Sequence, residues 1–236
     1  MKMATGGVDL SLYAKALPLY GRNLGVALPP LAAAIVTVLL SYISGPLTDP
    51  VGGTGGGIFG IISYLVFGFA FGISVIFADD AWRHGRASIV SAWHEARRKL
   101  GSILLATLGF YFVIYVAGLV GGLIGGFVAI LLTALAAFGL IYAIPAASMG
   151  GIGGTYALNR SIQLVKAAPL ATAILTIVSI VVFFYVGQNG PEWFAAYAGA
   201  GAGYTVLKIL LPALAAGYVA LIVAKQYADI AFGRRW

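Results

Sequence analysis

Long stretches without a charged residue dominate the chain, and short groups of charged residues separate them. The uncharged windows hold 26 residues from Arg22 to Asp49, 29 from Asp49 to Asp79, 60 from Lys99 to Arg160, and 25 from Lys166 to Glu192. A helix that crosses the hydrocarbon core of a bilayer needs about 20 apolar residues at a rise of about 1.5 Å each. Each shorter window therefore predicts one crossing. The longest predicts two, with Gly118–Gly126 as the bend.

Lys208 interrupts the last apolar region, which has 15 uncharged residues before it and 16 after it. The pattern thus predicts an all-α integral membrane bundle of six transmembrane helices in a single domain, residues 1–236. The predicted helices are Leu24–Ile43, Ile58–Ala78, Gly101–Leu119, Gly122–Ala146, Ala168–Gly187 and Gly203–Ala224.

Basic residues occupy every second connection between these helices. They are Lys2, Lys15 and Arg22; Arg83, Arg86, Arg97, Arg98 and Lys99; Arg160 and Lys166; and Lys225, Arg234 and Arg235. The other connections contain Asp49 and Glu192 and no Lys or Arg. Because Lys and Arg accumulate in cytoplasmic loops, we expect both termini on the cytoplasmic side of a multi-pass protein.

The composition supports this class, since 61% of the residues are hydrophobic and 9% are charged, against about 25% charged in soluble domains. The net charge of +7 follows from the orientation of the loops, so no nucleic-acid partner is expected. Membrane lipids are the expected partners, together with other membrane subunits or further copies of the chain. The chain has no Cys, which excludes disulfides, thiolate metal sites and a Cys nucleophile.

Two cytoplasmic segments have the pattern of amphipathic helices. In residues 1–23, Val8–Tyr20 carries an apolar stripe that suits the membrane interface, although Pro18 argues against a regular helix throughout. In residues 79–100, Ser88 is a suitable N-cap for a helix over Ile89–Leu100. Its last turn contains three basic residues that we expect to contact lipid headgroups: Arg97, Arg98 and Lys99.

Two groups are candidates for substrate binding. Asp79 and Asp80 end the second predicted helix, with Arg83 one turn later. They can form a proton- or cation-responsive site near the cytoplasmic mouth, because intramembrane carboxylates often mark ion paths. The alternative is an ion pair between Asp79 and Arg83, four residues apart on a helix. Lys208 can bind an anionic group between helices, or extend its stem to the outer headgroups. Pro212, one turn later, can break the last helix, as in transporters.

Other chemistry is not expected. His84 and His94 have too few acidic neighbours for a zinc site, and no catalytic motif is present, so we expect neither a metal, nor a cofactor, nor enzyme activity. Spaced glycines such as Gly68/Gly72, Gly121/Gly125 and Gly122/Gly126 match the small-xxx-small packing motif. Packing within one chain is favoured over dimerisation.

Two connections resemble a known group. Asp80-Ala-Trp-Arg-His-Gly-Arg-Ala-Ser and Pro145-Ala-Ala-Ser-Met-Gly-Gly-Ile-Gly-Gly-Thr-Tyr-Ala-Leu-Asn-Arg-Ser-Ile-Gln-Leu-Val-Lys resemble segments of six-span bacterial proteins. These proteins are related to the membrane domain of some glycerophosphodiester phosphodiesterases. The resemblance implies a bacterial cytoplasmic (inner) membrane protein, and the phosphodiesterase domain has no counterpart. The family usually has an acidic residue shortly after the Pro-Ala pair, where this chain has Met149 and glycines.

Three functions follow as hypotheses. The first is a non-enzymatic membrane protein that acts by helix packing, as a subunit or a membrane-organising factor, because mid-membrane polar groups are scarce. The alternative is a small transporter or permease subunit for an apolar or anionic solute, with Lys208 and the Asp79/Asp80 pair at its two mouths. A lipid-active enzyme is the third.

Overall fold

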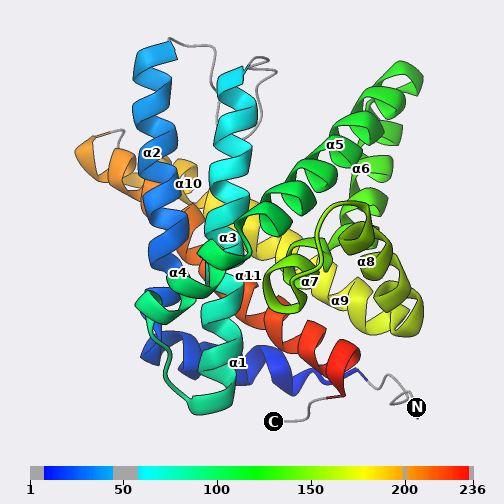
Figure 1. Ribbon diagram of the computed structural model, residues 1–236. Coiled ribbons are helices and arrows are strands. Elements are labelled where there is room, and N and C mark those ends of the chain that lie inside the picture. Colours follow the sequence, from blue (N-terminus) through cyan, green and yellow to red (C-terminus); the bar gives the residue numbers. More distant parts are fainter. Residues whose placement is uncertain (1–7, 45–57, 199–200, 234–236) are drawn as a thin grey trace.

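The computed structural model describes residues 8–44, 58–198 and 201–233, and the regular elements in these ranges are helices (Figure 1). Lys2, Asp49, Arg234 and Arg235, which contribute to the predicted charge pattern, lie outside the described residues. The elements are α1 (Ser11–Arg22), the 3-10 helix η1 (Leu24–Ala27), α2 (Leu28–Ser44), α3 (Ile58–His84), α4 (Ile89–Arg98), α5 (Leu100–Ile124), α6 (Gly126–Leu140), α7 (Ala143–Gly150), α8 (Thr155–Ala167), α9 (Pro169–Ile180), the π-helix η2 (Val181–Gln188), α10 (Gly190–Ala198) and α11 (Ala202–Phe232).

Within the described ranges, five helical segments are long and apolar enough to cross a membrane. They are Phe59–His84, Leu100–Ile124, Gly126–Gly150, Pro169–Tyr197 and Gly203–Phe232. A sixth is obtained only if Ser11–Arg22 and Leu24–Leu40, which meet at an angle of 92°, count as one broken span. The chain is therefore an all-helical membrane protein with five to six helices of spanning length.

A sharp bend separates α1 from η1 and α2, and α1 runs across the lower end of the molecule in Figure 1. The buried Asn23 occupies this bend. Its Nδ2 donates to the carbonyl oxygens of Leu19 and Gly85, both at 3.0 Å, and its Oδ1 accepts from the amide of Ala87 at 3.1 Å. One side chain thus ties the end of α1 to the connection between α3 and α4.

Helix α1 continues through Pro18, so the expectation that this residue interrupts the helix is wrong. Pro18 removes one amide donor and leaves the carbonyl of Ala14 without its helical partner. Both residues are exposed, so water or headgroups satisfy that carbonyl at low cost. On its other side, α1 is fixed to α11, because the Tyr20 hydroxyl donates to Leu214 O at 2.9 Å.

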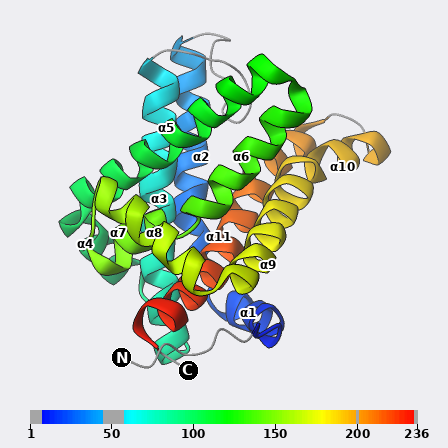
Figure 2. The ribbon, with the colours of Figure 1, turned by 90° about the vertical axis from the view of Figure 1, so that its right-hand side faces the viewer.

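Helices α3 and α11 form the centre of the bundle (Figures 1 and 2). About half of each apolar window is buried, 56% and 50% respectively, against 17–22% for the other three spans. Small residues permit close approach: a Cβ on Gly68 would lie 2.1 Å from the Thr107 side chain of α5. A Cβ on Gly72 would lie 2.9 Å from Ile103. Packing within the chain, as predicted, accounts for both glycines.

The α5–α6 hairpin is held together by a third small residue. A Cβ on Gly121 would lie 2.4 Å from the Cα of Ala129, so the two backbones are in contact there. Gly122 and Gly126 have no neighbouring atom at the Cβ position, so intrachain packing does not explain them.

The fourth predicted crossing, Gly122–Ala146, is in fact two helices, α6 and α7, separated by a turn at Ile141 and Tyr142. Pro145 provides the reason, because its ring excludes the carbonyl of Ile141, four residues earlier, and it has no amide to donate. Ser161 of α8 satisfies the interrupted backbone. Its hydroxyl donates to Gly139 O at 2.9 Å and accepts from the amide of Tyr142 at 3.1 Å.

Two further helix limits differ from prediction. Helix α3 continues past Ala78 to His84, and α11 continues past Ala224 to Phe232, unbroken at Pro212. In both helices, charged residues follow the apolar segment. Ion pairs between residues four apart, Asp79–Arg83 in α3 and Lys225–Asp229 in α11, stabilise the helix beyond that segment. Gly233, at φ +64°, then ends α11.

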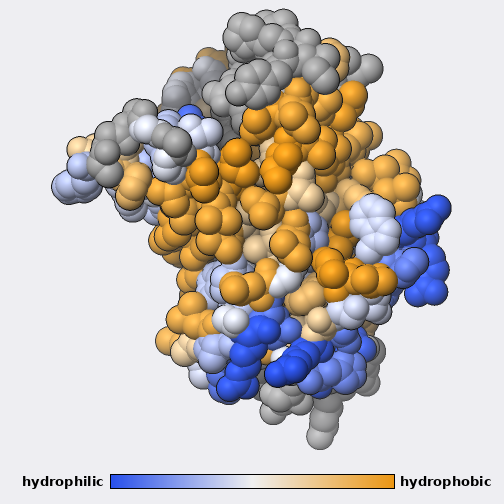
Figure 3. Space-filling view, turned by 90° about the vertical axis from the view of Figure 1, so that its left-hand side faces the viewer, coloured by the Kyte–Doolittle hydropathy of each residue, from blue (hydrophilic) through white to orange (hydrophobic). Residues whose placement is uncertain are grey.

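The surface is divided by polarity. On the face shown in Figure 3, hydrophobic side chains cover the middle of the molecule and hydrophilic ones gather towards the lower end. Large apolar side chains are strongly exposed on the α5–α6 hairpin, for example Leu123 at 90% and Phe127 at 79%. Such exposure is costly in water and favourable in hydrocarbon, so the apolar surface of the α5–α6 hairpin is suited to face the membrane.

Candidate functional site

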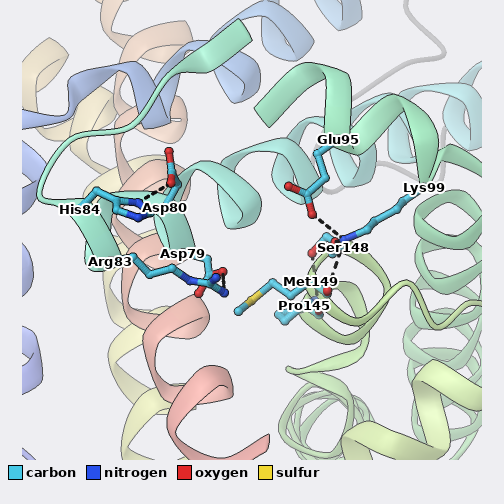
Figure 4. Close-up of polar contacts among 9 residues, drawn as sticks. All are labelled: Asp79, Asp80, Arg83, His84, Glu95, Lys99, Pro145, Ser148 and Met149. Atoms are coloured by element: carbon cyan, nitrogen blue, oxygen red, sulfur yellow. Dashed lines mark hydrogen bonds and ion pairs between the residues drawn. The ribbon is translucent and has the colours of Figure 1, made fainter. Parts of the chain in front are cut away.

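A cavity of about 300 Å³ lies between α3, α4 and α7. Its lining residues are Ile76, Asp79, Asp80 and Arg83 from α3; Ser91, Ala92 and Glu95 from α4; and Met149 from α7. Three of the four sequence candidates for substrate binding, Asp79, Asp80 and Arg83, therefore line one cavity. In Figure 4, Asp79 and Arg83 lie on one side and face Glu95 and Met149 on the other.

The α3 wall is organised by ion pairs along the helix. Arg83 binds Asp79, and His84 Nδ1 lies 2.7 Å from Asp80 Oδ1. Each pair is four residues apart, which places both members on one helix face. The side chain of Asp79 is 14% exposed and that of Asp80 is 40% exposed, so the wall extends from the protein interior to the surface. The ion-pair interpretation of Asp79 and Arg83 is confirmed, and both residues still line the cavity.

The opposite wall depends on Lys99. Its Nζ donates to Glu95 Oε1 and to the carbonyl oxygen of Ser148, both at 2.7 Å, and to that of Met149 at 3.2 Å (Figure 4). The last carbonyls of a helix lack intrahelical donors and attract cations. Lys99 supplies that cation to α7 and fixes α4 against it.

The predicted trio of headgroup-binding residues is thereby divided. Arg97 and Arg98 are exposed on α4, whereas Lys99 turns inward and is only 23% exposed. Ser88 caps α4 as predicted, since its hydroxyl accepts from the amide of Ser91 at 3.5 Å. The orientation of Lys99 depends on α7, which is about 50 residues away in sequence.

Lys208 does not belong to this cavity. It lies near the start of α11, where its Nζ is 3.2 Å from the hydroxyl of Tyr204 and 3.8 Å from Glu192 Oε1. Its side chain is 62% exposed. The structure thus separates Lys208 from Asp79, Asp80 and Arg83, which the sequence analysis also treated as two groups.

Two charged residues acquire roles that the sequence analysis did not assign. Glu95 contributes a carboxylate to the cavity, and its spacing from Lys99 was the available signal. Lys225, counted as a cytoplasmic loop residue, lies inside α11, is 9% exposed and pairs with Asp229. Its Nζ also lies 6.0 Å from the ring centroid of Trp82, a distance typical of a cation–π contact.

The lining supplies three carboxylates and one guanidinium, which can bind a polar or cationic group. Among the described residues, no group of three or more His, Asp and Glu side chains is arranged to hold a metal ion. Comparisons with protein-family models, curated proteins and solved structures find no match to this chain.

Proposed function

We propose that this chain is a six-span protein of the bacterial cytoplasmic membrane, with both termini inside, that acts by helix packing as a subunit or membrane-organising factor. The proposal includes the kinship with six-span bacterial proteins and an absence of catalysis. Its main support is the distribution of charge: the ion pairs found in the described helices lie near helix ends, at Asp79–Arg83, Asp80–His84, Glu95–Lys99, Lys208–Glu192 and Lys225–Asp229.

The middle of the bundle supports the same proposal. Ala, Val, Ile and Leu side chains fill the contact between α3 and α11. Several buried hydroxyl groups of the bundle bond to backbone carbonyls, as when Ser74 of α3 donates to Val26 O at 2.7 Å and Thr172 of α9 donates to Ala168 O at 2.8 Å. Because a hydrophilic solute needs polar groups along its whole path, such a core suits packing better than conduction.

Transport remains the second candidate, because the cavity at α3, α4 and α7 has the size and polarity of a binding site. Lys208 is exposed beside Glu192 and does not line this cavity. Its position therefore disfavours a transporter that uses Lys208 to bind solute at one mouth. The acidic lining also disfavours an anionic solute.

The native size of the protein tests the packing role. We expect the chain, extracted from its own membrane in mild detergent, to have a mass above that of one chain in native mass spectrometry. The excess should correspond to a fixed number of copies or to a defined membrane partner. A single chain that carries only lipid would contradict the packing role and favour the transport alternative.

A further inference from the structure

We propose that the cavity between α3, α4 and α7 binds a primary ammonium group at the cytoplasmic face of the membrane. The ligand class is a small alkylamine, which is supplied either by the ethanolamine headgroup of a phospholipid or by a free amine in the cytoplasm. This inference goes beyond helix packing. It depends on the membrane location of the α3–α4 end and is independent of any partner subunit.

The cavity has the dimensions for such a group. Its volume of about 300 Å³ is at the lower limit of small-molecule pockets, which span about 300–1,000 Å³. Ile76, Ala92 and Met149 supply apolar surface that suits the methylene carbons of an alkylamine. Met149 lies at the end of α7 and places an apolar side chain on this side of the cavity.

The charge of the lining selects a cation. Asp79, Asp80 and Glu95 contribute three negative charges, whereas Arg83 and Lys99, whose Nζ bonds Glu95, contribute two positive charges, which gives a formal sum of −1. This is notable in a chain with 14 basic and 7 acidic residues, because three of its seven acids meet at one cavity. Carboxylates only accept hydrogen bonds, and a primary ammonium carries three donors.

The two walls hold their carboxylates in place before a ligand arrives. Lys99 fixes Glu95 and joins α4 to the end of α7, while His84 holds Asp80 on α3. Asn23 fastens the connection between α3 and α4 through the backbone of Gly85 and Ala87. Preorganised acceptors bind with less loss of conformational entropy. Asp80 and Glu95, about 40% exposed, leave the entrance accessible.

The position of the cavity suits a headgroup. It lies near the His84 end of α3, and α4, which lines it, also carries the exposed Arg97 and Arg98. Basic residues at this level are attracted to lipid phosphates. An ethanolamine headgroup carries its ammonium next to its phosphate, so the carboxylates of the cavity suit the ammonium and the basic residues at this end of the molecule suit the phosphate.

The test measures lipid retention by the purified full-length protein in native mass spectrometry. Phosphatidylethanolamine, phosphatidylcholine and phosphatidylglycerol with identical acyl chains are added at equal concentration. We expect the ethanolamine lipid to bind about tenfold more tightly than the other two, because charge-assisted hydrogen bonds contribute that much. Choline has no N–H donor, and glycerol has no cation. Free ethanolamine is titrated separately by thermal shift.

Three variants locate the site. Asp80→Asn removes one carboxylate, and Ala92→Leu fills the cavity without a change of charge; each is expected to reduce binding about tenfold. Glu192→Gln makes the matching change in an acid beside Lys208 and is expected to have no effect. Unfolding temperatures of all three are measured in parallel.

The results separate the two sources. Preference for the ethanolamine lipid without a response to free ethanolamine identifies the headgroup, and a response to free ethanolamine identifies a soluble amine. Equal or stronger binding of phosphatidylglycerol, no binding of either amine, or an equal loss in Glu192→Gln would overturn the proposal. If the cavity variants fail to fold, the ranking of the three lipids by the wild-type protein decides.

Discussion

Lys99 and its neighbours show how little the type of a residue says about its role in this chain. Arg97, Arg98 and Lys99 are consecutive cations at the end of α4, with Lys99 as its C-cap, and by sequence they are equivalent. In the folded protein, Arg97 and Arg98 are exposed, and Lys99 bonds Glu95 and two carbonyls of α7. The pairing with Glu95 is visible in the spacing of four residues. The carbonyl partners are not, because they come from a helix end that is distant in sequence.

Lys99→Met tests this role. The variant deprives the carbonyls of Ser148 and Met149 of a charged donor and leaves Glu95 without its cation. We expect the free energy of unfolding in detergent to fall by about 1–3 kcal/mol. Arg98→Met, an exposed neighbour, is expected to change it by less than about 0.5 kcal/mol. Similar losses in the two variants would show that Lys99 does not join α4 to α7.

At the scale of elements, the break between α6 and α7 shows why a broken helix persists inside a membrane protein. Hydrocarbon offers no partner for free backbone groups, so irregular backbone survives only where protein satisfies it. A proline such as Pro145 favours an interruption of a helix. The sequence analysis gave Ser161, which satisfies both sides of the break, no role. Its role became clear through the packing of α8 on α6.

Ser161→Ala is expected to lower the free energy of unfolding by about 1–3 kcal/mol, because Gly139 O and the amide of Tyr142 lose their partner. Ser102→Ala is the matched control, since the Ser102 hydroxyl makes an exposed contact of 3.4 Å with Gly151 O. Denaturant unfolding monitored by circular dichroism compares the two. If Ser161→Ala is as stable as Ser102→Ala, another group satisfies the break.

At the scale of the whole molecule, the helices differ in how much of their apolar surface is buried inside the protein. The most buried, α3 and α11, form the centre, and α5, α6 and α9 present apolar side chains outward. Helix α1, at 92° to the following helix, is oriented as an interfacial helix is relative to a spanning one. The end that carries α1, the α3–α4 connection and the cavity is therefore the end that we assign to the cytoplasm.

Cysteine labelling tests this orientation, and the chain contains no native Cys to interfere. Tyr197→Cys, at a residue 95% exposed on α10, is expected to react with a membrane-impermeant maleimide in cells whose outer membrane is permeabilised. Arg86→Cys, in the α3–α4 connection, is expected to react only after the cytoplasmic membrane is opened as well. Reaction of both from the same compartment would refute the proposed topology, with consequences for the amine site.

The sequence by itself determined that the chain is a helical membrane protein and where most apolar helices begin, because hydrophobic length and charge placement are local properties. It also indicated the Asp79–Arg83 pair, since a spacing of four residues suffices. The tertiary structure alone decided that Asp80, Glu95 and Met149 line one cavity and that Lys99 turns inward. Those outcomes depend on which helix ends meet in space, and a local pattern does not specify the partner: Lys99 bonds carbonyls of α7 that are about 50 residues away in sequence.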